Sequence, residues 1–80
     1  MAAVSGVNGI YVVVDEKGNV FRVDGTQGKK DLAITLTGKA PYNVACGVGA
    51  AYESCVIVDS AGNCWRGGAR NNGAAFTQVP

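Results

Sequence analysis

The sequence predicts an all-β, antiparallel protein made of two duplicated hairpin units. The first observation is that β-branched and aromatic runs, such as "IYVVVD" from Ile10, alternate with glycine-containing turns, while no segment shows helical periodicity. The second is a repeat: "VVVDEKGNVFRV" from Val12 and "VIVDSAGNCWRG" from Val56 share Asp, Gly, Asn and Arg at an offset of 44 residues. We therefore expect a single domain, 1–80, with repeats at about 4–40 and 44–80.

Each repeat contains a hairpin whose turn fixes its register. In the first hairpin, residues 10–15 and 19–24 flank Glu16-Lys17-Gly18, which fits a type I turn followed by a left-handed glycine. Asp15, and Asp59 in the second hairpin, would accept bonds from the backbone amides of the turn. The predicted pairs are Val14 with Val20, Val13 with Phe21, Val12 with Arg22, Val58 with Cys64, Ile57 with Trp65 and Val56 with Arg66.

Both faces of these hairpins are largely apolar, apart from the paired arginines Arg22 and Arg66. A sheet with one face in water would alternate apolar and polar residues instead. We therefore expect the hairpin strands to be central and packed on both faces. The matched arginines are expected to contact either backbone carbonyls or a carboxylate.

Three further strands bring the predicted total to about six or seven. Residues 31–37 alternate, which places Leu32, Ile34 and Leu36 together on one face. Residues 42–48 alternate again, and residues 74–80 are expected to form a last edge strand. Glycine-rich residues 67–73 are expected to form a loop.

The charge pattern gives no support for binding nucleic acid or a membrane surface. The net charge is +1, and charged residues make up only 16% of the chain, against about 25% in ordinary domains. Such a surface is covered by small polar groups, or part of it is hidden against a partner or another copy.

The start of the chain, "MAAVSGVNG", lacks the charged region and long apolar core of a signal peptide, and no run approaches a membrane span. These features predict a cytoplasmic protein. The alternative is a secreted protein whose signal peptide was removed.

The three cysteines, Cys46, Cys55 and Cys64, are interpreted mainly as small core residues. Their odd number argues against a disulfide framework and for a reducing compartment. One disulfide plus one free thiol is the alternative. Cys64 is predicted to face Val58, so Cys55 and Cys64 should not bridge within their hairpin.

The chain offers no catalytic or metal-binding constellation. It has no His, which removes the commonest general base and a common metal ligand. The cysteines have no His to activate them, and Asp15 and Asp59 are assigned to turns. We therefore predict no enzymatic activity, no metal and no cofactor.

Candidate binding residues gather where the second hairpin ends. A Trp ring can stack on a sugar or anchor a protein partner, and Arg and Asn supply planar hydrogen-bond donors. Against a ligand role, Trp65 matches Phe21 in the repeat, and matched aromatic residues are more often core. The candidate residues are Trp65, Arg66, Arg70, Asn71 and Asn72.

"VACG" from Val44, a short loop, a strand, "DSAGN" from Asp59 and a following aromatic residue together resemble the regulator-of-chromosome-condensation repeat. The resemblance implies blades of a β-propeller. It carries over no functional residue, because the family's His is absent and its Trp-Gly is here Trp65-Arg66-Gly67. A small β-sandwich or barrel built from the duplicated unit is the alternative fold.

Two functions fit these features. The first is a non-catalytic interaction module that assembles with itself through its strands, since two blades cannot close a ring, or docks on a protein partner. The second is a small secreted β-protein, lectin-like or a host-directed effector, for which carbohydrate would be the ligand. A weaker third reading is an accessory subunit of a larger complex.

Overall fold

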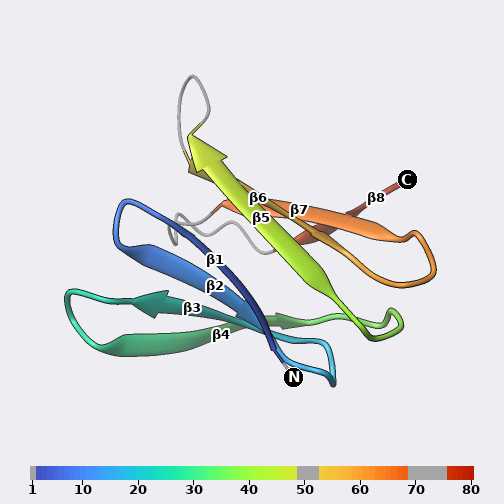
Figure 1. Ribbon diagram of the computed structural model, residues 1–80, viewed down its shortest axis with the longest axis horizontal. Coiled ribbons are helices and arrows are strands. Elements are labelled where there is room, and N and C mark those ends of the chain that lie inside the picture. Colours follow the sequence, from blue (N-terminus) through green and yellow to red (C-terminus); the bar gives the residue numbers. More distant parts are fainter. Residues whose placement is uncertain (1, 49–52, 69–75) are drawn as a thin grey trace.

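The computed structural model describes residues 2–48, 53–68 and 76–80 (Figure 1). Every regular element in these residues is a strand, so the all-β antiparallel class is confirmed. The strands form two four-stranded sheets, each ordered as its strands follow along the chain. The first sheet contains β1 (Ala3–Val7), β2 (Ile10–Val14), β3 (Asn19–Asp24) and β4 (Lys29–Thr35); the second contains β5 (Asn43–Val48), β6 (Glu53–Val58), β7 (Cys64–Gly68) and β8 (Thr77–Val79).

The two repeated hairpins have the register that their turns predict. In each hairpin the Asp before the turn stands opposite the Asn after it. The Asp15 amide donates to the Asn19 carbonyl, and the Asp59 amide donates to the Asn63 carbonyl, each at 3.0 Å. All six predicted pairs are present: Val14–Val20, Val13–Phe21 and Val12–Arg22 between β2 and β3, and Val58–Cys64, Ile57–Trp65 and Val56–Arg66 between β6 and β7. The hairpins lie in different sheets.

The turn chemistry is also as predicted. Asp15 Oδ1 accepts hydrogen bonds from the amides of Lys17 and Asn19, each at 2.9 Å. Gly18 has a φ of 86° and Gly62 a φ of 91°, in the left-handed region where a side chain would be strained. The short-range sequence pattern is thus sufficient to define both turns.

The strand count exceeds the predicted six or seven, because β1 was not expected. β1 pairs with β2 from Ala3 opposite Val14 to Val7 opposite Ile10. Its sequence, "AVSGV", contains Ala, Ser and Gly, which are poor strand formers, so its pairing depends on β2 rather than on its own propensity. The predicted last strand is present as β8, at the edge of the second sheet.

A bulge in β4 overturns the prediction that Leu32 and Ile34 share one face. Val20 pairs with Ile34 but Phe21 pairs with Leu32, so Ala33 is an extra residue between them. The inserted residue reverses the side to which the following side chains point. Leu32 is consequently 59% exposed, on the side of the sheet away from the core.

The two sheets face each other across one hydrophobic core. β1 lies against β5, where Ser5 Oγ accepts a hydrogen bond from the Cys46 amide at 3.0 Å. From there the sheets diverge, so that β4 and β8 lie well apart (Figure 1). The buried core residues are Val12, Val14, Val20 and Leu36 from the first half, and Val44, Cys55, Ile57, Trp65 and Phe76 from the second.

Each sheet covers only one of its faces with the core, which corrects the expectation that both hairpins are packed on both faces. On β2, Val12 is fully buried while its neighbour Tyr11 is 46% exposed. On β6, Ile57 is fully buried while Val56 is 43% exposed. The second apolar face of each hairpin is therefore open in the single chain.

Candidate functional site

Trp65 lies in the core, so the structure supports the second of its two interpretations. Its side chain is only 4% exposed, on the inner face of β7, and its ring is tilted by 58° to the Tyr42 ring at a centroid distance of 6.3 Å. A Cβ added at Gly38 would come within 2.6 Å of the Trp65 ring, so the connection between the sheets lies directly against it. A ring buried in this way does not present a face to a sugar.

Arg66 is exposed on the other side of β7, because successive residues of a strand point to opposite faces. Trp65 and Arg66 therefore do not point toward one common ligand. Arg70, Asn71 and Asn72 lie outside the described residues. A ligand-binding role for these three residues and for Arg66 stays a prediction.

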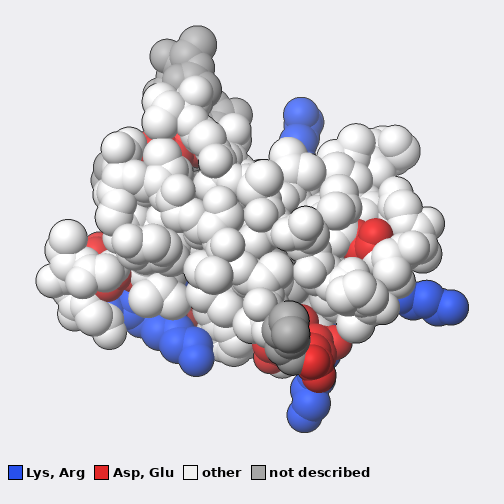
Figure 2. Space-filling model, viewed as in Figure 1, with Lys and Arg blue, Asp and Glu red and all other residues white. Residues whose placement is uncertain are grey.

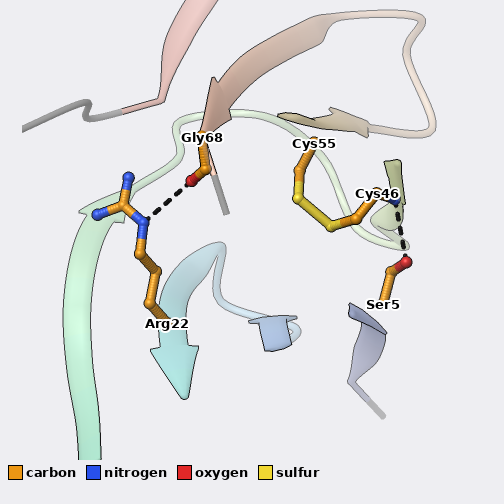
Figure 3. Close-up of a disulfide and its surroundings, with 5 residues drawn as sticks. All are labelled: Ser5, Arg22, Cys46, Cys55 and Gly68. Atoms are coloured by element: carbon orange, nitrogen blue, oxygen red, sulfur yellow. Dashed lines mark hydrogen bonds between the residues drawn. A yellow bond between two sulfur atoms is a disulfide. The ribbon is translucent and has the colours of Figure 1, made fainter. Parts of the chain in front are cut away.

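Arg22, the counterpart of Arg66 in the first repeat, connects the two sheets (Figure 3). Its Nε donates to the Gly68 carbonyl at 3.1 Å, and its guanidinium lies 5.7 Å from the centroid of the Phe76 ring. Burial lowers the pKa of Arg22, and the nearby Asp31 carboxylate partly offsets this effect. Arg22 remains charged at neutral pH. The expected contact of a matched arginine with a backbone carbonyl is present here.

Cys46 and Cys55 form a disulfide (Figure 3), and Cys64 is a free thiol. The interpretation of all three as simple core residues is therefore wrong, and the alternative of one disulfide plus one thiol is correct. Cys46 on β5 stands directly opposite Cys55 on β6, which brings the sulfurs within bonding distance. The exclusion of a Cys55–Cys64 bridge is confirmed. The sequence between β5 and β6 lacks a turn signature like that of the repeated hairpins, so the sequence does not set the register that brings the two sulfurs together.

The turn of the second hairpin is tied to the connection between the sheets through Asp59. This carboxylate is 7% exposed and accepts bonds from the amides of Lys39, Ala61 and Asn63 and from the Asn63 side chain. Burial acts to raise the pKa of Asp59, but these donors outweigh it and lower the pKa to about 2. The carboxylate thus has a structural role, as the sequence predicts.

Most of the exposed large hydrophobic residues in the described part of the chain lie on the open faces of the two sheets. The exposed fraction is 61% for Val4, 59% for Leu32 and 41% for Val58. The open face of the first sheet carries the apolar residues Val4, Tyr11, Val13, Phe21, Val23 and Leu32, together with Lys30. The open face of the second sheet consists of Ala45, Val56, Val58, Cys64, Arg66 and Val79.

Charge is sparse on the surface seen in Figure 2. Acidic and basic side chains lie around its rim, and the middle is uncharged. Near the open face of the first sheet, Lys30 Nζ lies 4.3 Å from the centroid of the Phe21 ring. No group of three His, Cys, Asp or Glu residues that could hold a metal ion occurs in residues 2–48, 53–68 or 76–80. The same stretches contain no helix that is long and apolar enough to cross a membrane.

Comparison with protein-family models, curated proteins and solved structures finds no match to this chain. The likeness to the regulator-of-chromosome-condensation repeat therefore stays a resemblance of motifs.

Proposed function

We propose that the chain is a non-catalytic interaction module that assembles with copies of itself through the open faces of its sheets. The observation that carries this proposal is the open apolar face on each of the two sheets. Val4, Tyr11 and Val56 are all more than 40% exposed, although each lies within a strand. Apolar faces of this kind mark interaction sites in soluble proteins.

The low charge supports the same conclusion. Charged residues make up 16% of the chain and hydrophobic residues 48%. An interface core is depleted in charged side chains relative to the rest of a surface. Arg66 is the only charged residue on the open face of the second sheet as defined above.

Light scattering coupled to size-exclusion chromatography tests this function over a wide range of protein concentration. We expect a discrete mass that is a multiple of 8.2 kDa. The mass should be the same with and without reductant, because the Cys46–Cys55 bond lies within one chain. A mass of 8.2 kDa at every concentration would contradict the proposal. So would an oligomer that the Cys64→Ala variant no longer forms, since it would be held by Cys64 alone.

A small secreted β-protein is the second candidate, and the Cys46–Cys55 disulfide favours it. Disulfides persist in oxidising compartments and are rare in the cytosol. Alkylation of the protein from its natural source, under denaturing conditions without reductant, is expected to label one thiol. Labelling of three thiols would instead place the native protein in a reducing compartment. A glycan array then tests the lectin-like form of this candidate.

A further inference from the structure

We infer that copies of this chain join head to tail: the open face of the first sheet of one copy packs on the open face of the second sheet of the next. This inference rests on the proposed self-assembly and specifies its geometry. The two sheets already pack on each other in this way within one chain.

Within the chain, the two sheets use opposite faces of the repeated unit. The offset of 44 residues makes Val12 the counterpart of Val56, and Val13 the counterpart of Ile57. On the first sheet Val12 is fully buried in the core, but on the second sheet it is Ile57 that is fully buried. The internal contact is therefore made between two unlike faces of one repeated structure.

Each open face consequently has a buried counterpart. Val56 and Val58, on the open face of the second sheet, match Val12 and Val14, which are 0% and 1% exposed. Cys64 on the same face matches the fully buried Val20.

The open face of the first sheet shows the same relation. Val13 and Phe21 match Ile57 and Trp65. Val4 matches Val44, since they stand opposite Val13 and Ile57 respectively. Val4 is 61% exposed and Val44 is 8% exposed.

The two open faces are thus the same two kinds of face that form the core of the chain. A second copy can place one against the other and repeat the internal contact. Such a contact is heterologous, so a pair keeps one open face at each end, and further copies are added until the assembly closes into a ring of discrete mass. A two-fold symmetric dimer would instead bring like faces together, which the chain does not do internally.

One end of this contact between copies is more polar than its internal equivalent. Internally, Arg22 contacts Gly68 and Phe76. Arg66 takes the place of Arg22, and the backbone carbonyl of Asp24 in the next copy takes the place of the Gly68 carbonyl. Thr77 pairs with Arg66 in the second sheet, and Asp31 pairs with Arg22 in the first, so Thr77 and Asp31 hold equivalent positions. The residues just before them, Phe76 and Lys30, are therefore also equivalent. The Arg66 guanidinium of one copy would therefore lie near the Asp24 carbonyl and the Lys30 side chain of the next copy, where Arg22 has a carbonyl and an aromatic ring.

Two substitutions distinguish the head-to-tail arrangement from other modes of assembly. Val4→Glu changes the first open face, and Val56→Glu changes the second; both side chains are exposed in the single chain, so folding should survive. Circular dichroism of each variant confirms that it does. The matched control is Leu32→Glu: Leu32 is as exposed as Val4, but its counterpart Gln78 is exposed within the chain, outside the internal contact.

The decisive measurement is the mass of an equimolar mixture of the two variants. Alone, Val4→Glu and Val56→Glu should each be monomeric, while Leu32→Glu keeps the wild-type mass. Mixed, they should form a dimer that grows no further, because each supplies one intact face. A mixture that stays monomeric, or one variant that assembles fully alone, would overturn the head-to-tail geometry. If the wild-type chain is itself a monomer, the proposed self-assembly fails, and this inference fails with it.

The alkylation rate of Cys64 provides a second test, in which the substitution lies on the other sheet and leaves the surroundings of Cys64 within its own chain unchanged. In a head-to-tail contact, Val4→Glu removes the partner that covers Cys64, although the two residues lie on different sheets. We expect Val4→Glu to raise the rate of Cys64 alkylation by on the order of tenfold over the wild-type oligomer. An unchanged rate in an assembled wild type would show that the second open face is not covered by the first.

Discussion

Breaking the Cys46–Cys55 disulfide is expected to lower the free energy of unfolding by about 2.6 kcal/mol. The bond closes a loop with a sequence separation of 9. The chain-entropy relation for a loop of that size gives this figure at 25 °C. An 80-residue domain has roughly 4–12 kcal/mol in total. The bond thus supplies a substantial share of the stability of this small fold.

Urea unfolding, followed by circular dichroism at one protein concentration, measures the effect. With a urea slope of about 1 kcal/mol/M, reductant should lower the midpoint of the wild-type chain by roughly 2–3 M. The double variant Cys46→Ala/Cys55→Ala should unfold at a low midpoint that reductant does not move. Cys64→Ala is the matched control and should keep the whole response. A wild-type midpoint that ignores reductant, or a response that disappears in Cys64→Ala, would refute the reasoning.

Three further experiments probe the core and the turns. Phe76→Ala removes a side chain that is 1% exposed and should lower the free energy of unfolding in urea by about 3–5 kcal/mol. The control Thr77→Ala changes an exposed neighbour and should lower it by less than about 0.5 kcal/mol. Similar losses for the two variants would contradict the buried position of Phe76. Gly62→Ala should cost about 1–2 kcal/mol for its positive φ alone, and Gly18→Ala clearly more, because its Cβ would lie 2.7 Å from the Leu36 carbonyl oxygen; equal thermal midpoints would show that this approach is not tight. The folded-state pKa of Asp59 is about 2, below its ordinary value of 3.8, so its contribution is present above about pH 4 and is lost as the pH falls toward 2. Asp59→Asn should flatten the fall of the thermal midpoint in that window, and an unchanged slope would assign the acid sensitivity to other groups.

The sequence was most informative where local chemistry decides the structure. In both hairpins the Asp before the turn and the Gly within it define the turn type, and the turn type sets the register of every following pair. The roles of Asp15 and Asp59 followed from the same short-range pattern. These features depend on a few adjacent residues, so no knowledge of the rest of the chain was needed.

The misses arose where distant segments decide the outcome. β1 has little strand propensity of its own and exists because β2 has an edge for it to pair with. The bulge at Ala33 inserts one extra residue, which the alternation of apolar and polar residues in the sequence does not reveal. The Cys46–Cys55 bond requires the β5–β6 register, and the buried position of Trp65 requires the facing sheet. Both faces of each hairpin are apolar in sequence, so the sequence did not indicate which face of each sheet would be buried in the core.

The position of Trp65 makes its fluorescence a probe of how the two sheets of one chain pack together. It is the single tryptophan of the chain, and it is 4% exposed on the face of the second sheet that meets the first. Its fluorescence emission should shift to longer wavelength when the sheets separate, even while the backbone of each sheet stays paired. Emission and far-ultraviolet circular dichroism that change together would show that the halves fold as one cooperative unit. An emission change at lower denaturant would reveal an intermediate in which two formed sheets have come apart.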